Sequence, residues 1–132
     1  MSNAKQNAAR PRKKASPAQM EGRRSVCPVA CALDLFGDKW TLLVVRDLLL
    51  GKAHFKEFLA SPEKIATNIL SDRLARLVDH GIVERYPSTD IAGREAYRLT
   101  AKGLALRGLM AQIRAWGLAN IEGTEARLQA ES

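Results

Sequence analysis

The segment from residue 54 to residue 103 most constrains the fold, because two helical patterns are followed there by a strand, a turn and a second strand. The first helix has apolar residues at i, i+3 and i+4, the spacing of one buried face, and it ends at Ser61 and Pro62. Those apolar residues are Phe55, Phe58 and Leu59. This order of elements predicts a winged helix-turn-helix, whose second helix has the shape to enter the DNA major groove.

The second helix is predicted from about Ala66 to His80, with aliphatic residues on one side and polar residues on the other. The aliphatic side contains Ile65, Leu70, Leu74, Leu77 and Val78. The polar side carries hydrogen-bonding groups that suit base edges, and its first turn should be the most exposed part. The candidates for contacting bases are therefore Thr67, Asn68, Ser71 and Asp72.

A β-hairpin should follow Gly81, which supplies a left-handed residue after the helix. Residues 82–86 and 95–99 are rich in β-branched and aromatic side chains, while residues 87–93 favour a turn. Arg94 directly follows the predicted turn, at the exit of the hairpin tip. An arginine at this place can reach a phosphate or a narrow minor groove. A solvated surface charge is the alternative explanation of Arg94.

Basic residues around the motif are candidates for holding the DNA backbone, since lysine and arginine are common phosphate partners. Some of them fall near the start of the first motif helix, where helix N–H groups and cations can act together on a phosphate. The candidate set is Lys52, His54, Lys56, Lys64, Arg76 and Arg94.

Length and composition favour one globular domain. The chain has 132 residues, of which 46% are hydrophobic and 27% charged. No apolar run approaches the ~18 residues that a membrane span needs, and no apolar segment of a signal peptide follows the basic N-terminus. We therefore expect a cytoplasmic protein with no membrane contact.

Most of the net charge of +7 belongs to an N-terminal segment that has no hydrophobic periodicity. We expect residues 1–24 to be disordered, with residues 2–4 resembling a cloning-vector remnant, residues 25–122 to form the domain, and residues 123–132 to be a short tail. The basic tail either strengthens DNA binding without sequence preference or only keeps the chain soluble.

Further helices are predicted on both sides of the motif. Cys27 precedes a proline suited to the first helical position, so Cys27 should be the N-cap of a helix that ends at Gly37. Asp38 should cap the next helix, which stops at Gly51. After the wing, Thr100 should cap one helix of about 20 residues, ~30 Å long. The predicted class is thus mainly α with a small β-hairpin.

The last helix has more apolar surface than one small domain can cover, which predicts a homodimer formed through the first and C-terminal helices. The candidate interface residues are Leu106, Leu109, Met110, Ile113 and Trp116. Gly103, Gly108 and Gly117 would let two backbones approach closely. In the alternative, the last helix folds over the first helix of its own chain. A dimer would present paired recognition helices to a pseudo-palindromic operator.

From Cys27 to about Trp116 the chain resembles the HxlR-type winged-helix transcriptional regulators of bacteria, which are related in fold to the MarR and ArsR types. The resemblance is carried by a Cys-Pro start, the helix junction GDKW, the segment IATNILSDRLARLVDHGIVER and the post-hairpin motif YRLTAKG. It implies a homodimer that binds operator DNA and regulates nearby genes without catalysis. Ala66 replaces a frequent serine before the recognition helix, and residues 91–93 replace frequent wing prolines.

Cys27 is the candidate for a response to oxidants. At an N-cap its thiol meets the positive end of the helix dipole, and Arg23 and Arg24 are close in sequence, which also favours the thiolate. Several HxlR-type regulators sense oxidants or electrophiles through a cysteine at this position, so the resemblance also indicates Cys27. In the alternative, Cys27 is only a structural cap or a buried thiol. Cys31, one turn later, is expected to be a small buried hydrophobe.

Other chemistry is not indicated by the sequence. The two cysteines and two histidines lack the spacing of a compact zinc site. Ser71 and Asp72 have no histidine near them in sequence, so they do not suggest a catalytic set. We expect no metal, no cofactor and no enzyme activity, although a small molecule or an oxidant could act as effector.

A second function class stays open from the sequence alone. The charge near the motif is nearly balanced, so the polar helix face and the wing could bind another protein instead of DNA. Specific DNA binding with a steep salt dependence would separate the two hypotheses.

Overall fold

The computed structural model describes residues 24–126, and the expectations for residues 1–23 and 127–132 lie outside the described residues. The elements are α3 (Pro28–Phe36), α4 (Thr41–Leu49), α5 (Phe55–Leu59), α6 (Thr67–Asp79), β1 (Val83–Pro87), β2 (Glu95–Leu99), α7 (Ala101–Leu104) and α8 (Arg107–Asn120). This order confirms the predicted helix-turn-helix and hairpin. The chain divides into two compact units between Leu35 and Phe36.

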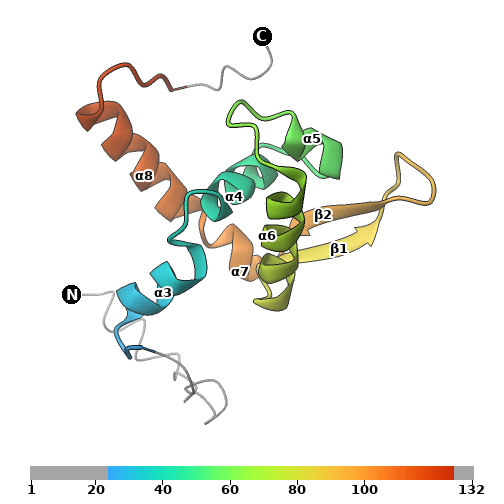
Figure 1. Cartoon of the computed structure of the whole chain (residues 1–132), viewed down its shortest axis with the longest axis horizontal. Coiled ribbons are helices and arrows are strands. Elements are labelled where there is room, and N and C mark those ends of the chain that lie inside the picture. The colour runs from blue at the N-terminus through green and yellow to red at the C-terminus, as the bar shows by residue number, and fades with distance from the viewer. Residues whose placement is uncertain (1–23, 127–132) are drawn as a thin grey trace. The chain divides into compact units, whose positions relative to one another are not determined.

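The core of the second unit lies where α4, α5 and α6 meet the hairpin, and Figure 1 shows α6 beside the start of β1. Leu70, Leu74 and Leu77 are buried at i, i+4 and i+7, which places them on one face of α6. The other buried apolar residues are Val44, Val45, Leu48, Phe58, Ile82, Val83 and Ala96. The leucine periodicity of α6 is therefore what attaches this helix to the rest of the unit.

Asp38 organises the start of α4, although the N-cap position is Trp40 and not Asp38 as predicted. Its carboxylate accepts hydrogen bonds from the backbone amides of Trp40 and Thr41 at 3.1 and 3.2 Å. The regular helix begins at Thr41, later than a cap at Asp38 predicts, because residues 38–40 form a turn. Gly51 follows the end of α4 with φ +98°, a left-handed conformation that suits glycine.

The hairpin is joined to the helix-turn-helix by its backbone and by a ring contact. β1 and β2 are antiparallel, with Val83 opposite Leu99. The amide of Tyr97 donates to the carbonyl of Ala53 at 2.9 Å, so β2 is also bonded to the segment before α5. The Tyr97 ring meets Phe58 edge to face at a centroid distance of 6.3 Å. The base of the hairpin is therefore anchored to α5.

The single helix predicted after the wing is wrong, because the structure contains two helices there. Thr100 caps α7 by accepting a hydrogen bond from the Gly103 amide at 3.2 Å, but α7 ends at Leu104. A turn at Ala105 and Leu106 separates it from α8. The 14 residues of α8 make a helix of about 21 Å, and none of them is buried.

Gly103 has a structural role that differs from the predicted one. A Cβ atom at this buried position would overlap the carbonyl oxygen of Ile82 and would crowd the Leu99 side chain. The close approach that the glycine permits is thus within one chain, where α7 crosses the start of β1, rather than between subunits. A Cβ atom at Gly108 in α8 would have open space around it.

We expect Gly103→Ala to lower the free energy of unfolding by about 1–3 kcal/mol, because the new methyl group meets backbone that no rotamer change can move away. Gly108→Ala is the matched control, and it should raise the free energy of unfolding by up to about 1 kcal/mol, since alanine is the better helix former. Urea denaturation followed by circular dichroism measures both. Equal effects of the two substitutions would contradict the packing of α7 on β1.

Candidate nucleic-acid interface

The polar face of α6 begins at its first turn. Thr67, Asn68, Ser71 and Asp72 are all exposed, while the leucines of the same helix are buried. Thr67 and Asn68 precede Ser71 and Asp72 by one helical turn, so the four side chains form one continuous surface. The structure therefore brings together the residues that the sequence proposes for base contacts.

The start of α6 has no side-chain cap. Its N-cap is Ala66, which has no side-chain acceptor for the first-turn amides. Such amides carry the partial positive charge of a helix N-terminus. Lys64, two residues earlier, has φ +58°, which is uncommon for a residue with a Cβ atom. The chain thus turns sharply from α5 into α6.

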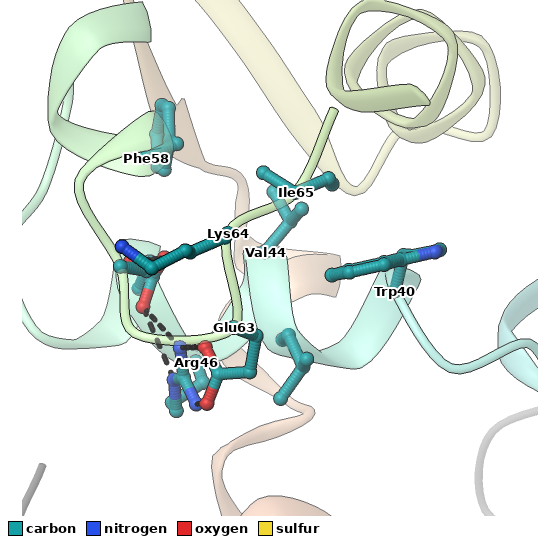
Figure 2. A pocket seen from close by; sticks show the side chains of 10 residues that line it. Trp40, Val44, Arg46, Phe58, Glu63, Lys64 and Ile65 are labelled. Atoms are coloured by element: carbon teal, nitrogen blue, oxygen red, sulfur yellow. Dashed lines mark hydrogen bonds and ion pairs between the residues drawn. The ribbon is translucent and has the colours of Figure 1, made fainter. Parts of the chain in front are cut away.

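A buried carboxylate of α4 holds this turn. Asp47 is 3% exposed, and it accepts hydrogen bonds from the Arg46 guanidinium at 3.0 and 3.1 Å and from the Ser61 hydroxyl. Lys52 Nζ donates to the same hydroxyl at 2.7 Å. Arg46 also donates two hydrogen bonds of 2.8 Å to Glu63, and Figure 2 shows the two side chains against each other. The hydrogen bonds from Arg46 lower the pKa of the Glu63 carboxyl.

Arg73 joins the back of α6 to the start of α4. Its Nε donates to the Asp38 carboxylate at 2.9 Å, and its Nη1 donates to the Asp72 carboxylate at 2.6 Å. Partial burial of Asp38 opposes ionisation, but hydrogen bonds from Thr41, Arg73 and the Trp40 amide outweigh it and hold the Asp38 pKa well below its usual range. Arg73 is not among the residues that the sequence singles out. The sequence feature that could have identified it is a cation directly beside the leucine face of α6.

The residues predicted to contact phosphates fall into two groups. The exposed members are Lys56, Lys64 and Arg94, and Arg76 is half-buried. Lys52 and His54 are also half-buried, and their side chains are hydrogen-bonded within the protein. The exposed cations come from α5, from the turn before α6 and from the wing, so they lie on chain segments both before and after the recognition helix.

The two amides just ahead of α5 are hydrogen-bonded within the protein. Glu57 Oε1 accepts hydrogen bonds from the amides of Ala53 and His54, each at 2.8 Å. These two backbone bonds are the main reason that the pKa of Glu57 is lowered. The amides of Ala53 and His54 are therefore already occupied within the protein.

The wing loop connects β1 to β2 and is closed by Ser88. The Ser88 amide donates to the carbonyl of Arg94 at 2.9 Å. The Ser88 hydroxyl oxygen accepts hydrogen bonds from the amides of Asp90 and Ile91 at 3.1 and 3.0 Å. Arg94 stands exposed at the exit of this loop, as predicted.

Cys27 stands at the start of α3, as predicted, because its carbonyl accepts the first helical hydrogen bond from the Cys31 amide at 2.9 Å. Cys27 is exposed, whereas Cys31 is half-buried with its thiol 3.3 Å from the Ser25 carbonyl. Arg24, which the sequence places beside Cys27, pairs with Asp34 at 2.6 Å.

Residues 35–125 match the family model described as HxlR-like helix-turn-helix, a span that includes α4 to α8 and both strands. The chain belongs to the HxlR-like helix-turn-helix family. Proteins of this family are transcriptional regulators and not enzymes. The resemblance inferred from the sequence is confirmed.

Two relatives, both named as HTH-type transcriptional regulators, illustrate the sequence similarity. The transcriptional regulator YodB of Bacillus subtilis is 32% identical over 93 residues, which are 70% of this chain and 83% of YodB. An uncharacterized HTH-type transcriptional regulator of Synechocystis is 33% identical over 85 residues, which are 64% of this chain. The match spans 63% of that Synechocystis protein, just under two thirds of its length.

Solved structures share the same fold. PA1607, a proposed transcription factor, has a TM-score of 0.72 and 40% identity, and the match covers 80% of this chain and 75% of PA1607. The redox regulator HypR in its reduced form has a TM-score of 0.66 and 30% identity over 73% of this chain and 95% of HypR. HypR is also known in an oxidised form, and YodB in reduced, diamide-treated and quinone-bound forms.

Two absences hold for residues 24–126. No helix in that range has the length and apolar character needed to cross a membrane. Nor does the same part of the chain gather three His, Cys, Asp or Glu side chains as ligands for a metal ion.

Proposed function

We propose that this HxlR-like chain is a homodimeric transcriptional regulator that reads a pseudo-palindromic operator with the polar face of α6. The observation that carries the proposal is that this face is exposed and continuous, while the opposite face of α6 is fixed by buried leucines and by the Arg73–Asp38 ion pair. A rigid helix with a polar outer face is what major-groove recognition requires.

The chemistry of this face fits base edges. Asn68 has an amide that can bond adenine through one donor and one acceptor, and the hydroxyls of Thr67 and Ser71 can meet several bases. The Asp72 carboxylate can accept from a cytosine amino group. Its hydrogen bond from Arg73 holds this carboxylate in one orientation. We assign sequence discrimination to these four residues.

The exposed cations fit the DNA backbone. Lys56 and Lys64 come before α6 in the chain and Arg94 comes after it, while the half-buried Arg76 lies on α6 itself. Positive side chains at such places position a protein on phosphates without reading sequence. The uncapped first turn of α6 adds backbone N–H groups that favour an anion. Lys52, which is bonded to Ser61, contributes through the turn that it stabilises.

Dimerisation is supported by apolar surface that the described residues do not cover. On α8, Ile113 is 45% and Trp116 is 63% exposed, and Leu109 is also exposed. A groove of about 840 Å³ lies between the end of α4 and α8, lined in part by Leu49 and Met110. On α3, Val29 is 66% exposed. Burial against a second copy would remove this surface from water and would pair the recognition helices.

A response to oxidants or electrophiles through Cys27 is supported by its exposure at the start of α3 and by the redox forms known for HypR and YodB. Diamide would take two electrons and two protons from two thiols as one disulfide forms. Peroxide would convert a thiolate to a sulfenic acid. If α3 lies at the subunit contact, modification there would move the recognition helices away from the ~34 Å spacing of successive major grooves.

We expect Asn68→Ala to cost about 1–3 kcal/mol on the specific operator and little on random duplex, because it removes a base contact. Arg94→Ala should weaken binding to both duplexes and lower the salt slope by about one, because it removes a phosphate contact. The operator is first selected from genomic fragments, and the affinities are measured by fluorescence anisotropy. Asn120→Ala on α8 is the matched control.

Equal losses for Asn68→Ala on operator and random DNA would contradict its assignment to base contacts. Failure of the wild-type protein to bind any duplex at low salt would instead favour a protein partner for the same face.

Ile113→Glu should convert the dimer to a monomer or an aggregate, because it would bury an unpaired carboxylate at a cost of several kcal/mol. Gln112→Glu adds the same charge at the neighbouring position of α8 and should leave the dimer intact. Sedimentation velocity at micromolar concentration distinguishes these states. A folded wild-type monomer under those conditions would refute the proposed interface.

Cys27→Ser should abolish the change in operator affinity that mild diamide or peroxide causes in the wild-type protein, while Cys31→Ser should still respond. The reason is that Cys27 is exposed to a reagent in solution, whereas Cys31 is half-buried with its thiol bonded to the Ser25 carbonyl. Affinities before and after treatment, with mass spectrometry of the treated protein, provide the comparison. An identical response of wild type and Cys27→Ser would exclude this thiol switch.

A further inference from the structure

His54 connects two parts of the molecule that are far apart in sequence. It is the N-cap of α5, and its side chain is 18% exposed. Its Nδ1 lies 3.3 Å from Glu57 Oε1, on the same helix. Its Nε2 lies 2.7 Å from the hydroxyl oxygen of Ser88, the first residue of the wing loop. The ring therefore stands between the helix-turn-helix and the wing.

The hydrogen bonds of Ser88 show which way the proton of this contact points. The hydroxyl oxygen already accepts from the amides of Asp90 and Ile91, which use its two lone pairs. Its own hydrogen is then free to be donated to His54 Nε2. That direction of the bond corresponds to the tautomer that carries its hydrogen on Nδ1.

The same serine also determines where Arg94 lies. The Ser88 amide bonds the Arg94 carbonyl at 2.9 Å, so the entry and the exit of the wing loop meet at Ser88. The base of the hairpin is anchored through Tyr97 and Ala53, but the loop beyond it is largely exposed. A loop with few buried contacts opens easily unless a specific bond restrains it. The His54–Ser88 bond is such a restraint.

We propose that His54 is a positioning residue for DNA binding, which fastens the wing loop to the start of α5 and so sets where Arg94 meets the duplex. The inference rests on the proposed contact between the wing and DNA. It gives His54 a role different from holding a phosphate directly, because Nε2 is already paired with the Ser88 hydroxyl. Arg94 makes the contact, and His54 acts through it.

The first test uses the free protein. Hydrogen exchange followed by NMR should show faster exchange of the Asp90 and Ile91 amides in His54→Ala than in wild type, because the Ser88 hydroxyl is no longer held. His54→Gln should restore slow exchange, since its side-chain oxygen can accept the same proton. Lys56→Ala, two residues away and exposed, is the matched control and should leave the wing amides unchanged. Unchanged exchange in His54→Ala would overturn the proposal.

The second test is a double-mutant cycle on the selected operator. His54→Ala alone should weaken binding on the order of fivefold, the effect of one hydrogen bond. In an Arg94→Ala background it should have no further effect, and His54→Gln should bind like wild type. A direct phosphate contact by His54 would instead give a loss that adds to that of Arg94→Ala and that glutamine does not restore.

The outcomes distinguish the proposed DNA-binding function from the positioning role of His54. Wild-type protein that binds no operator refutes the proposed function, and with it the wing contact. Wild-type binding that Arg94→Ala weakens and His54→Ala leaves unchanged overturns the positioning role alone.

Discussion

The placement of the recognition helix depends on a buried charge. Asp47 lies almost wholly inside the second unit, and an ionised carboxylate there would cost several kcal/mol without hydrogen-bond donors. Arg46 and Ser61 supply those donors, and Lys52 bonds the same serine. The donors come from α4 and from the turn after α5, so satisfying the carboxylate also fixes the path of the chain into α6. Glu63 balances part of the added positive charge.

This arrangement explains how a short turn can include strain and still be precise. Lys64 adopts a left-handed conformation that costs on the order of 1 kcal/mol for a residue with a Cβ atom. Hydrogen bonds on the residues just before it hold the turn in that form. Beyond the turn, α6 is attached through its leucines and through Arg73, which leaves its opposite, polar face exposed. The same packing therefore makes the buried side of α6 rigid and leaves its polar side exposed.

The molecule has two kinds of exposed surface with different physical meaning. The polar face of α6 and the wing can remain in water at little cost. The apolar residues of α3 and α8 cannot, because neither helix has a buried residue of its own. In the proposed dimer, a second subunit would cover these faces, stabilise the protein and set the distance between the two α6 helices.

Local signals in the sequence determined much of this protein: the leucine period of α6, the β-branched strands, the Asp38 and Thr100 caps and the polar face with its candidate residues. Each depends on neighbours within one or two helical turns, which is the range over which periodicity and capping act. Only the tertiary structure decided that the last helix breaks after α7, that Gly103 packs on Ile82, that Asp47 is buried and that His54 meets Ser88. Those outcomes join residues distant in the chain, and a local pattern cannot specify which distant polar groups will meet when a shared core brings their elements together.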